Sequence, residues 1–183
     1  MARRSQRTIE LRVSELLHDG GIKQPPVDVR SIARLLRAVV ETVSAHTDIS
    51  GMLYRKSDGA VIGINEEHHP NRQRFSIAHE LGHLCLHENE LYLDRGGPSV
   101  FWRDAVSGQG VDDDEIEANH FAASLLMPRE FLISDIRQGQ VPAEALSRGD
   151  ERAIEVLARR YRVSPQAMTL RLINLRLIDP KGE

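Results

Sequence analysis

The chain has 183 residues, of which 40% are hydrophobic, 28% are charged and 4% are aromatic, so it is long enough to bury the core of a globular domain. Its net charge of -3 predicts neither a nucleic-acid nor a membrane partner. The single Cys85 excludes an internal disulfide and a cysteine zinc cluster, and no apolar run suits a secretory signal or a bilayer span, so we expect a cytoplasmic protein.

Two helices are predicted at the start of the chain. Apolar residues recur at helical spacing over residues 4–18, and Gly20-Gly21 ends that run. After a proline turn, Asp28 is placed to cap a second helix that reaches Leu36. Both helices are expected to serve packing.

Three strands are predicted next. Residues 39–43 are mostly β-branched, and residues 49–57 and 60–65 flank Asp58-Gly59, a strong hairpin signal. We therefore expect a small antiparallel sheet before the next helix. The strand over residues 60–65 leads into that helix, so we expect it to border a cleft and to offer an open edge to a substrate.

A metal-binding helix is predicted around residues 75–87. His79 and His83 are four residues apart, which places both imidazoles on one helix face, one turn apart. Glu80 can then reach a water on the same ion without being a ligand. This spacing suits a catalytic zinc site, although two histidines on an ordinary helix remain the alternative. Pro70 can open the helix, and Gly82 permits close packing against it.

Other histidines near this helix have less certain roles. His87 lies one further turn along, where a single rigid helix cannot easily bring three imidazoles to one ion, so we interpret it as structural or as an outer hydrogen-bond partner. His68 and His69 are candidates for extra ligands or for stabilising an oxyanion. Paired histidines in a polar turn are more often solvated.

Residues 88–111 contain several glycines and little periodicity, which predicts a long loop. Such loops often form lids or binding segments. Tyr92, Phe101 and Trp102 could contact a substrate there, or could anchor the loop to the body.

Residues 112–128 predict a helix that supplies the third metal ligand. If Glu115 is that ligand, Ala118 lies one turn on and is small enough to let two helices approach. Asn119 can then hydrogen-bond the far nitrogen of a ligating histidine. We favour Glu115 and keep Glu117 as the alternative.

The C-terminal part predicts further helices. Pro128 suits the first turn of a helix that ends at Gly139, and two helices follow within residues 150–178, joined by a tight turn at residues 162–165. This pair is helix-turn-helix-like. The acidic total and the missing turn glycine favour a pair that packs on the body over one that binds DNA. Five arginines add positive charge to it: Arg159, Arg160, Arg162, Arg171 and Arg176.

These motifs together resemble one family. The sequence His79-Glu-Leu-Gly-His83 with its extension to His87, followed by the run Glu-Ala-Asn-His-Phe-Ala-Ala-Ser-Leu-Leu-Met-Pro, is similar to the ImmA/IrrE family of bacterial and phage metallopeptidases. The resemblance implies a gluzincin-like zinc site in which His79 and His83 are ligands and Glu80 is the general base. Glu115 fits the family pattern Glu-x-x-Ala-Asn.

The resemblance also implies a fold and a function. We expect an α+β protein, mainly helical and zincin-like, with residues 1–183 forming one metallopeptidase domain and residues 150–178 packed on it. The implied activity is zinc-dependent cleavage of a helix-turn-helix transcriptional repressor in a stress, phage or mobile-element response. The alternative is a DNA-binding or protein-binding regulator with a structural metal. Tyr92, His69 and Tyr54 all remain candidates for the donor that assists the zinc.

Overall fold

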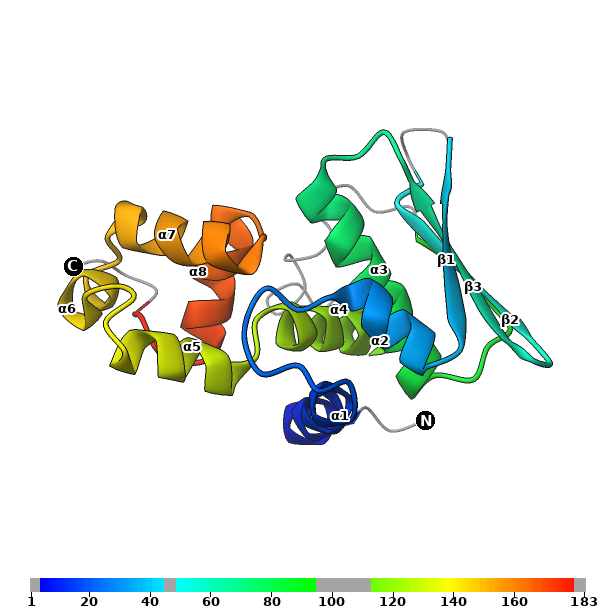
Figure 1. Cartoon of the computed structure of the whole chain (residues 1–183), viewed down its shortest axis with the longest axis horizontal. Coiled ribbons are helices and arrows are strands. Elements are labelled where there is room, and N and C mark those ends of the chain that lie inside the picture. The colour runs from blue at the N-terminus through cyan, green and yellow to red at the C-terminus, as the bar shows by residue number, and fades with distance from the viewer. Residues whose placement is uncertain (1–3, 45–48, 95–112, 180–183) are drawn as a thin grey trace.

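The computed structural model describes residues 4–44, 49–94 and 113–179, which form eight helices and four strands. Figure 1 shows the sheet at one end of the molecule, helices α5 to α8 grouped at the other, and α3 and α4 between them. No helix in these ranges is long and apolar enough to cross a bilayer. In chain order the elements are α1 (Gln6–Asp19), α2 (Val29–Leu35), β1 (Ala38–Val43), β2 (Gly51–Lys56), β3 (Gly59–Asn65), α3 (Pro70–Leu86), β4 (Leu91–Asp94), α4 (Asp113–Leu126), α5 (Arg129–Arg137), α6 (Ala143–Ser147), α7 (Glu151–Tyr161) and α8 (Pro165–Asn174).

The sheet is mixed, with strand order β1-β3-β2-β4. The predicted hairpin is confirmed, because β2 and β3 pair antiparallel around the Asp58-Gly59 turn. The prediction of a purely antiparallel sheet before the helix is wrong in two respects. Strand β3 returns from the hairpin beside β1 and pairs with it in parallel, and β4 follows α3 in the chain and pairs antiparallel with β2.

Strand β3 has no open edge. It is flanked by β1 on one side and β2 on the other, so the expectation that residues 60–65 offer an edge to a substrate is wrong. Among the described strands, the edges are β1 and β4. The residues of β4 were predicted as part of a loop, since four residues are too short a run to show a clear strand period.

One face of the sheet packs on the helices, and the other is open. Leu53, Ile62 and Ile64 are fully buried beneath the helices. Successive side chains of a strand point to opposite faces, so Tyr54 lies on the outer face, where it is exposed. The outer face thus points away from α3.

Helices α3 and α4 are in very close contact. An added Cβ at Gly82 would lie 3.0 Å from the Ala118 Cα and 3.1 Å from the Ala118 carbonyl oxygen. The predicted role of Gly82 in close packing is therefore confirmed. This approach brings two ligand-bearing helices together.

The C-terminal helices include the predicted pair, α7 and α8. The turn between them closes without glycine because Arg162 adopts a left-handed conformation with φ of 53°. The side chain of Ser164 caps α8 by accepting a hydrogen bond from the Ala167 amide. Arg171 of α8 is buried and donates to the Met127 carbonyl at 3.1 Å and to Glu10 at 3.2 Å, which ties α8 to α1 and to the end of α4.

Candidate metal centre

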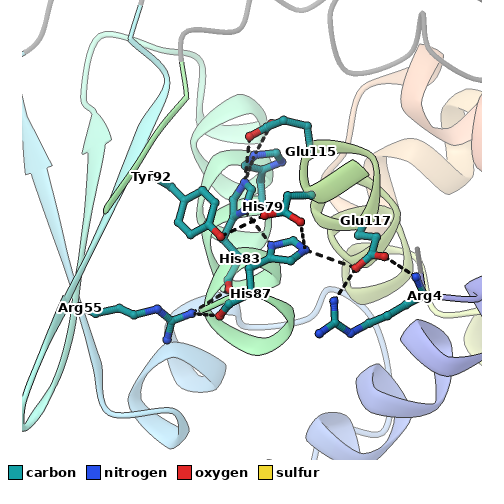
Figure 2. Close-up of polar contacts among 9 residues, drawn as sticks. Arg4, Arg55, His79, His83, His87, Tyr92, Glu115 and Glu117 are labelled. Carbon is teal, nitrogen blue, oxygen red and sulfur yellow. Dashed lines mark hydrogen bonds and ion pairs between the residues drawn. The ribbon is translucent and has the colours of Figure 1, made fainter. Parts of the chain in front are cut away.

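Helix α3 presents the two predicted histidine ligands side by side. Pro70 occupies the first turn of the helix, and the His69 side chain caps it by accepting from the Asn71 amide at 3.2 Å. His79 and His83 are 0% and 1% exposed, and their Nε2 atoms lie 3.0 Å apart (Figure 2). The spacing of four residues therefore produces the convergence that it predicts.

Glu115 of α4 completes a group of three potential ligands. Its Oε2 lies 3.3 Å from His79 Nε2, and its Oε1 lies 3.2 Å from His83 Nε2. Burial acts to raise the pKa of Glu115, but hydrogen bonds and charge from the two histidines outweigh burial and hold the pKa well below its usual range. Two imidazole nitrogens and one carboxylate form a donor set that suits zinc with an open position, so these residues fit a catalytic metal ion.

The far nitrogen of each histidine has a partner. His79 Nδ1 lies 3.0 Å from Asn119 Oδ1, in the arrangement predicted for Asn119, and His83 Nδ1 lies 3.0 Å from His87 Nδ1. Burial lowers the pKa of His79, but Glu115 and other nearby carboxylates raise it to about 9 overall. Burial lowers the pKa of His83. Two imidazoles this close repel each other when both are charged, so a raised pKa for His79 is consistent with a lowered pKa for His83.

Glu80 is buried beside these histidines with neither carboxylate oxygen hydrogen-bonded to any described residue. Burial raises the pKa of Glu80 to about 8. The carboxylate also lies against Gly51 of β2, where an added Cβ would be 2.5 Å from Glu80 Oε1. A carboxylate that titrates near neutral pH and has no partner of its own is suited to accept and return a proton.

Glu117, the alternative ligand, lies outside this group. It is 3% exposed and contacts His87 Nε2 at 3.3 Å, and it accepts hydrogen bonds from the backbone and the guanidinium of Arg4. The structure thus brings Glu115, and not Glu117, to the two imidazoles. The assignment of ligand and base roles to particular residues remains a prediction.

The three candidate donors for an oxyanion lie in different places. Tyr92 of β4 stacks on His83 with ring centroids 4.0 Å apart, and its hydroxyl donates to Asp114 at 3.3 Å. Tyr54 lies on the outer face of the sheet, and His69 is the cap of α3. Tyr92 is therefore the only one of the three that contacts a predicted ligand. Phe101 and Trp102 lie outside the described residues.

Two nearby residues were missed by the sequence analysis. Asp94 of β4 forms a second group of potential ligand atoms with His79 and Glu80. Arg55 of β2 donates to the carbonyl oxygens of His83 at 2.9 Å and of Leu84 at 3.1 Å, at the end of α3. The alternation of apolar and polar residues in Leu-Tyr-Leu-Asp94 is a weak sign of a strand that could carry Asp94 to the site, whereas no local pattern predicts the contacts of Arg55.

Arginines of the C-terminal pair are partly used inside the protein. Arg160 donates two hydrogen bonds to Asp135, at 2.7 and 3.0 Å, and Arg171 is buried against Glu10. The Arg171 side chain is thus buried in the packing of α8, and Arg160 joins α7 to Asp135 of α5.

Comparison with known proteins points to one family. Residues 37–172 match the family described as the IrrE N-terminal-like domain. The radiation response metalloprotease IrrE of Deinococcus deserti is 33% identical over 159 residues, which cover 80% of this chain and 51% of that protein, so the chain spans about half the length of this relative. A Mycobacterium tuberculosis transcriptional regulator has a similar fold, with a TM-score of 0.59 and 20% identity over 91% of this chain and 46% of that one.

Proposed function

The chain belongs to the ImmA/IrrE family of metallopeptidases, and from this membership we propose that it is a zinc-dependent endopeptidase. Its proposed substrate is a helix-turn-helix transcriptional repressor, cleaved at a specific site in a stress, phage or mobile-element response. Such a substrate places the reaction in the cytoplasm.

The observation that carries the proposal is the convergence of His79, His83 and Glu115 beside the buried carboxylate of Glu80, which has no hydrogen-bond partner among the residues that the structure describes. A structural zinc site is usually closed by four protein ligands, whereas three leave a position for water or substrate. The side chain of Glu115 is 39% exposed, so this group is reached from solvent. These features support catalysis over a purely structural metal.

Each residue has a distinct task in the proposed reaction. His79, His83 and Glu115 would hold the zinc ion, and Asn119 would keep His79 in the tautomer that presents Nε2. A bound zinc ion supplies Lewis acidity, which acidifies a water molecule and polarises the carbonyl of the scissile bond.

Glu80 would carry the proton. Its carboxylate would accept the proton of the attacking water and deliver it to the departing amine, so that it is regenerated in each turnover. Burial, which raises the pKa of Glu80 to about 8, makes both transfers accessible near neutral pH.

The test is cleavage of a co-expressed helix-turn-helix regulator encoded beside this chain, with fragments identified by mass spectrometry. Glu80→Gln should abolish the fragments while zinc content stays at the wild-type level. Glu88→Gln makes the same chemical change at an exposed position beyond the end of α3 and should leave cleavage intact. Cleavage by the Glu80→Gln protein at the wild-type rate would remove Glu80 from the mechanism.

The rival function is a DNA-binding regulator with a structural metal. Its signature is binding to duplex DNA that weakens steeply with salt, because phosphate contacts release counterions. Such binding, together with no cleavage of any neighbouring regulator, would replace the peptidase proposal.

A further inference from the structure

A line of polar side chains runs from the buried candidate ligand His83 to the partly exposed residue Arg4 near the start of the chain (Figure 2). His83 Nδ1 lies 3.0 Å from His87 Nδ1, and His87 Nε2 lies 3.3 Å from Glu117 Oε2. The guanidinium of Arg4 donates to Glu117 Oε2 at 2.9 Å, and the Arg4 backbone amide donates to Glu117 Oε1. The line thus joins three parts of the chain: α3, α4 and the segment before α1.

The chemistry at the two ends of this line fixes the direction of its hydrogen bonds. A histidine that binds a metal through Nε2 carries its proton on Nδ1, so His83 must donate there and His87 Nδ1 must accept. A neutral His87 then carries its own proton on Nε2 and donates it to the Glu117 carboxylate. Glu117 is acceptor-only when ionised, and Arg4 supplies the opposing charge and two donors.

We propose that His87, Glu117 and Arg4 act as a positioning relay that holds His83 in the tautomer and orientation required to bind the metal. None of the three belongs to the group of His79, His83 and Glu115 that would hold the metal. The relay goes beyond the ordinary partner of a metal-bound histidine because its last member, Arg4, is 113 residues away from Glu117 in sequence and lies outside both ligand-bearing helices.

The burial of Glu117 explains why Arg4 matters. A carboxylate that is 3% exposed has lost most of its hydration and needs compensating donors, and Arg4 supplies two of them. Replacing Arg4 by alanine keeps the backbone amide donor but removes the guanidinium, which donates to Oε2, the Glu117 oxygen that also faces His87. Without the guanidinium, that oxygen is no longer fixed opposite His87. His87 would then be free to turn, and the acceptor for His83 would be lost.

The other ligand on α3 is held differently. His79 Nδ1 lies 3.0 Å from the side-chain oxygen of Asn119, which is a neutral amide and not a carboxylate. Asp114 also approaches His87, but its Oδ1 is 3.5 Å from His87 Nε2, and its side chain is 34% exposed. The relay therefore predicts that Glu117 and Arg4 influence His83 specifically.

The inference rests on the metal-binding part of the proposed function and is independent of peptidase activity or substrate. The experiment measures the zinc affinity of the full chain by competition with a chelator. His87→Leu should weaken zinc binding by about 10- to 100-fold, and Arg4→Ala by about 10-fold. The matched control Arg7→Ala, at an exposed position on α1, should stay within about 2-fold of the wild type.

The coupling between variants separates a relay from general loss of stability. Adding Arg4→Ala to His87→Leu should cause no further loss of affinity, since both act through one line of contacts. With both proteins free of zinc, nitrogen chemical shifts of His83 should show a protonated Nδ1 in the wild type and a mixture of tautomers in Arg4→Ala. Because Arg4 is half-exposed, this variant tests the relay even if His87→Leu fails to fold.

The two possible failures are distinguishable. If the wild type binds no zinc, the proposed function fails along with the basis of the relay. If the wild type binds zinc and Arg4→Ala binds it equally tightly with an unchanged His83 tautomer, the relay alone is wrong. Additive losses in the double variant would also overturn it.

Discussion

Gly82→Ala should weaken zinc binding while it lowers the stability of the fold only slightly. An alanine Cβ there would lie 3.0 Å from the Ala118 Cα and 3.1 Å from the Ala118 carbonyl oxygen, whereas carbon atoms in contact prefer about 3.5–4.0 Å. Both neighbours belong to the backbone of α4, so the two helices must move apart by a few tenths of an ångström. Glu115, one turn from Ala118, would move away from His79 and His83.

The expected magnitudes follow from two opposing terms. Alanine gains about 1 kcal/mol of helix propensity over glycine, while overpacking a tight contact costs about 1–3 kcal/mol. The free energy of unfolding of the metal-free protein should therefore fall by only about 0–2 kcal/mol. Zinc affinity should fall by about 10-fold or more, because a ligand is displaced.

Thermal unfolding of the metal-free protein and chelator competition measure the two quantities separately. Adding Ala118→Gly should not rescue zinc binding, since the clash involves the Ala118 backbone and not its methyl group. A Gly82→Ala protein that is more stable than the wild type and binds zinc equally well would show that the helices do not depend on this contact.

Three further predictions test other parts of the structure. Gly51→Ala should displace the Glu80 carboxylate, since the new Cβ would lie 2.5 Å from Glu80 Oε1. Peptide cleavage should then be lost, while the zinc content measured by atomic absorption should stay at the wild-type level. Arg55→Ala should lower the free energy of unfolding by about 2–3 kcal/mol in urea titrations, because it removes a charged donor to the carbonyl oxygens at the end of α3. Arg55→Lys should recover less than half of that loss. Asp28→Ala should cost about 1 kcal/mol at neutral pH by removing the cap of α2. The hydrogen bond from Ser31 holds the pKa of Asp28 below its ordinary 3.8. The wild type should therefore exceed Asp28→Ala in free energy of unfolding by the full amount above pH 3.8, and this difference should disappear as the pH falls through the lower folded-state pKa. Unfolding curves at about pH 7 and about pH 2 would check this.

The parts of the site that the sequence predicted are those set by local geometry. The spacing of His79 and His83 determines their shared helix face wherever the helix lies, and Glu80 follows from its place between them. The choice between Glu115 and Glu117 depends on how α4 is rotated relative to α3. The positions of Ala118 and Asn119 indicated that rotation before any contact was known, and the structure has Asn119 beside His79.

The parts that the sequence did not predict depend on contacts between distant segments. Nothing in residues 38–43 indicates that β3 will insert beside them in parallel, because either pairing direction buries the same side chains. The contact between Arg4 and Glu117 likewise has no local signal, since the residues are 113 positions apart. Both the pairing of β1 with β3 and the contact of Arg4 with Glu117 are decided by packing between segments that are far apart in the sequence, which a local sequence pattern does not show.

The sheet residues named above at the candidate site come from its antiparallel strands β2 and β4. Gly51 and Arg55 come from β2, and Tyr92 and Asp94 come from β4, so the carboxylate of Glu80, the end of α3 and the ring of His83 all lie against these two strands. The pairing of β4 with β2 therefore places the Tyr92 ring on a ligand and Asp94 beside Glu80. Strand β4, which has only a weak signal in the sequence, thus packs against the His79-Glu80-His83 motif, which has a strong one.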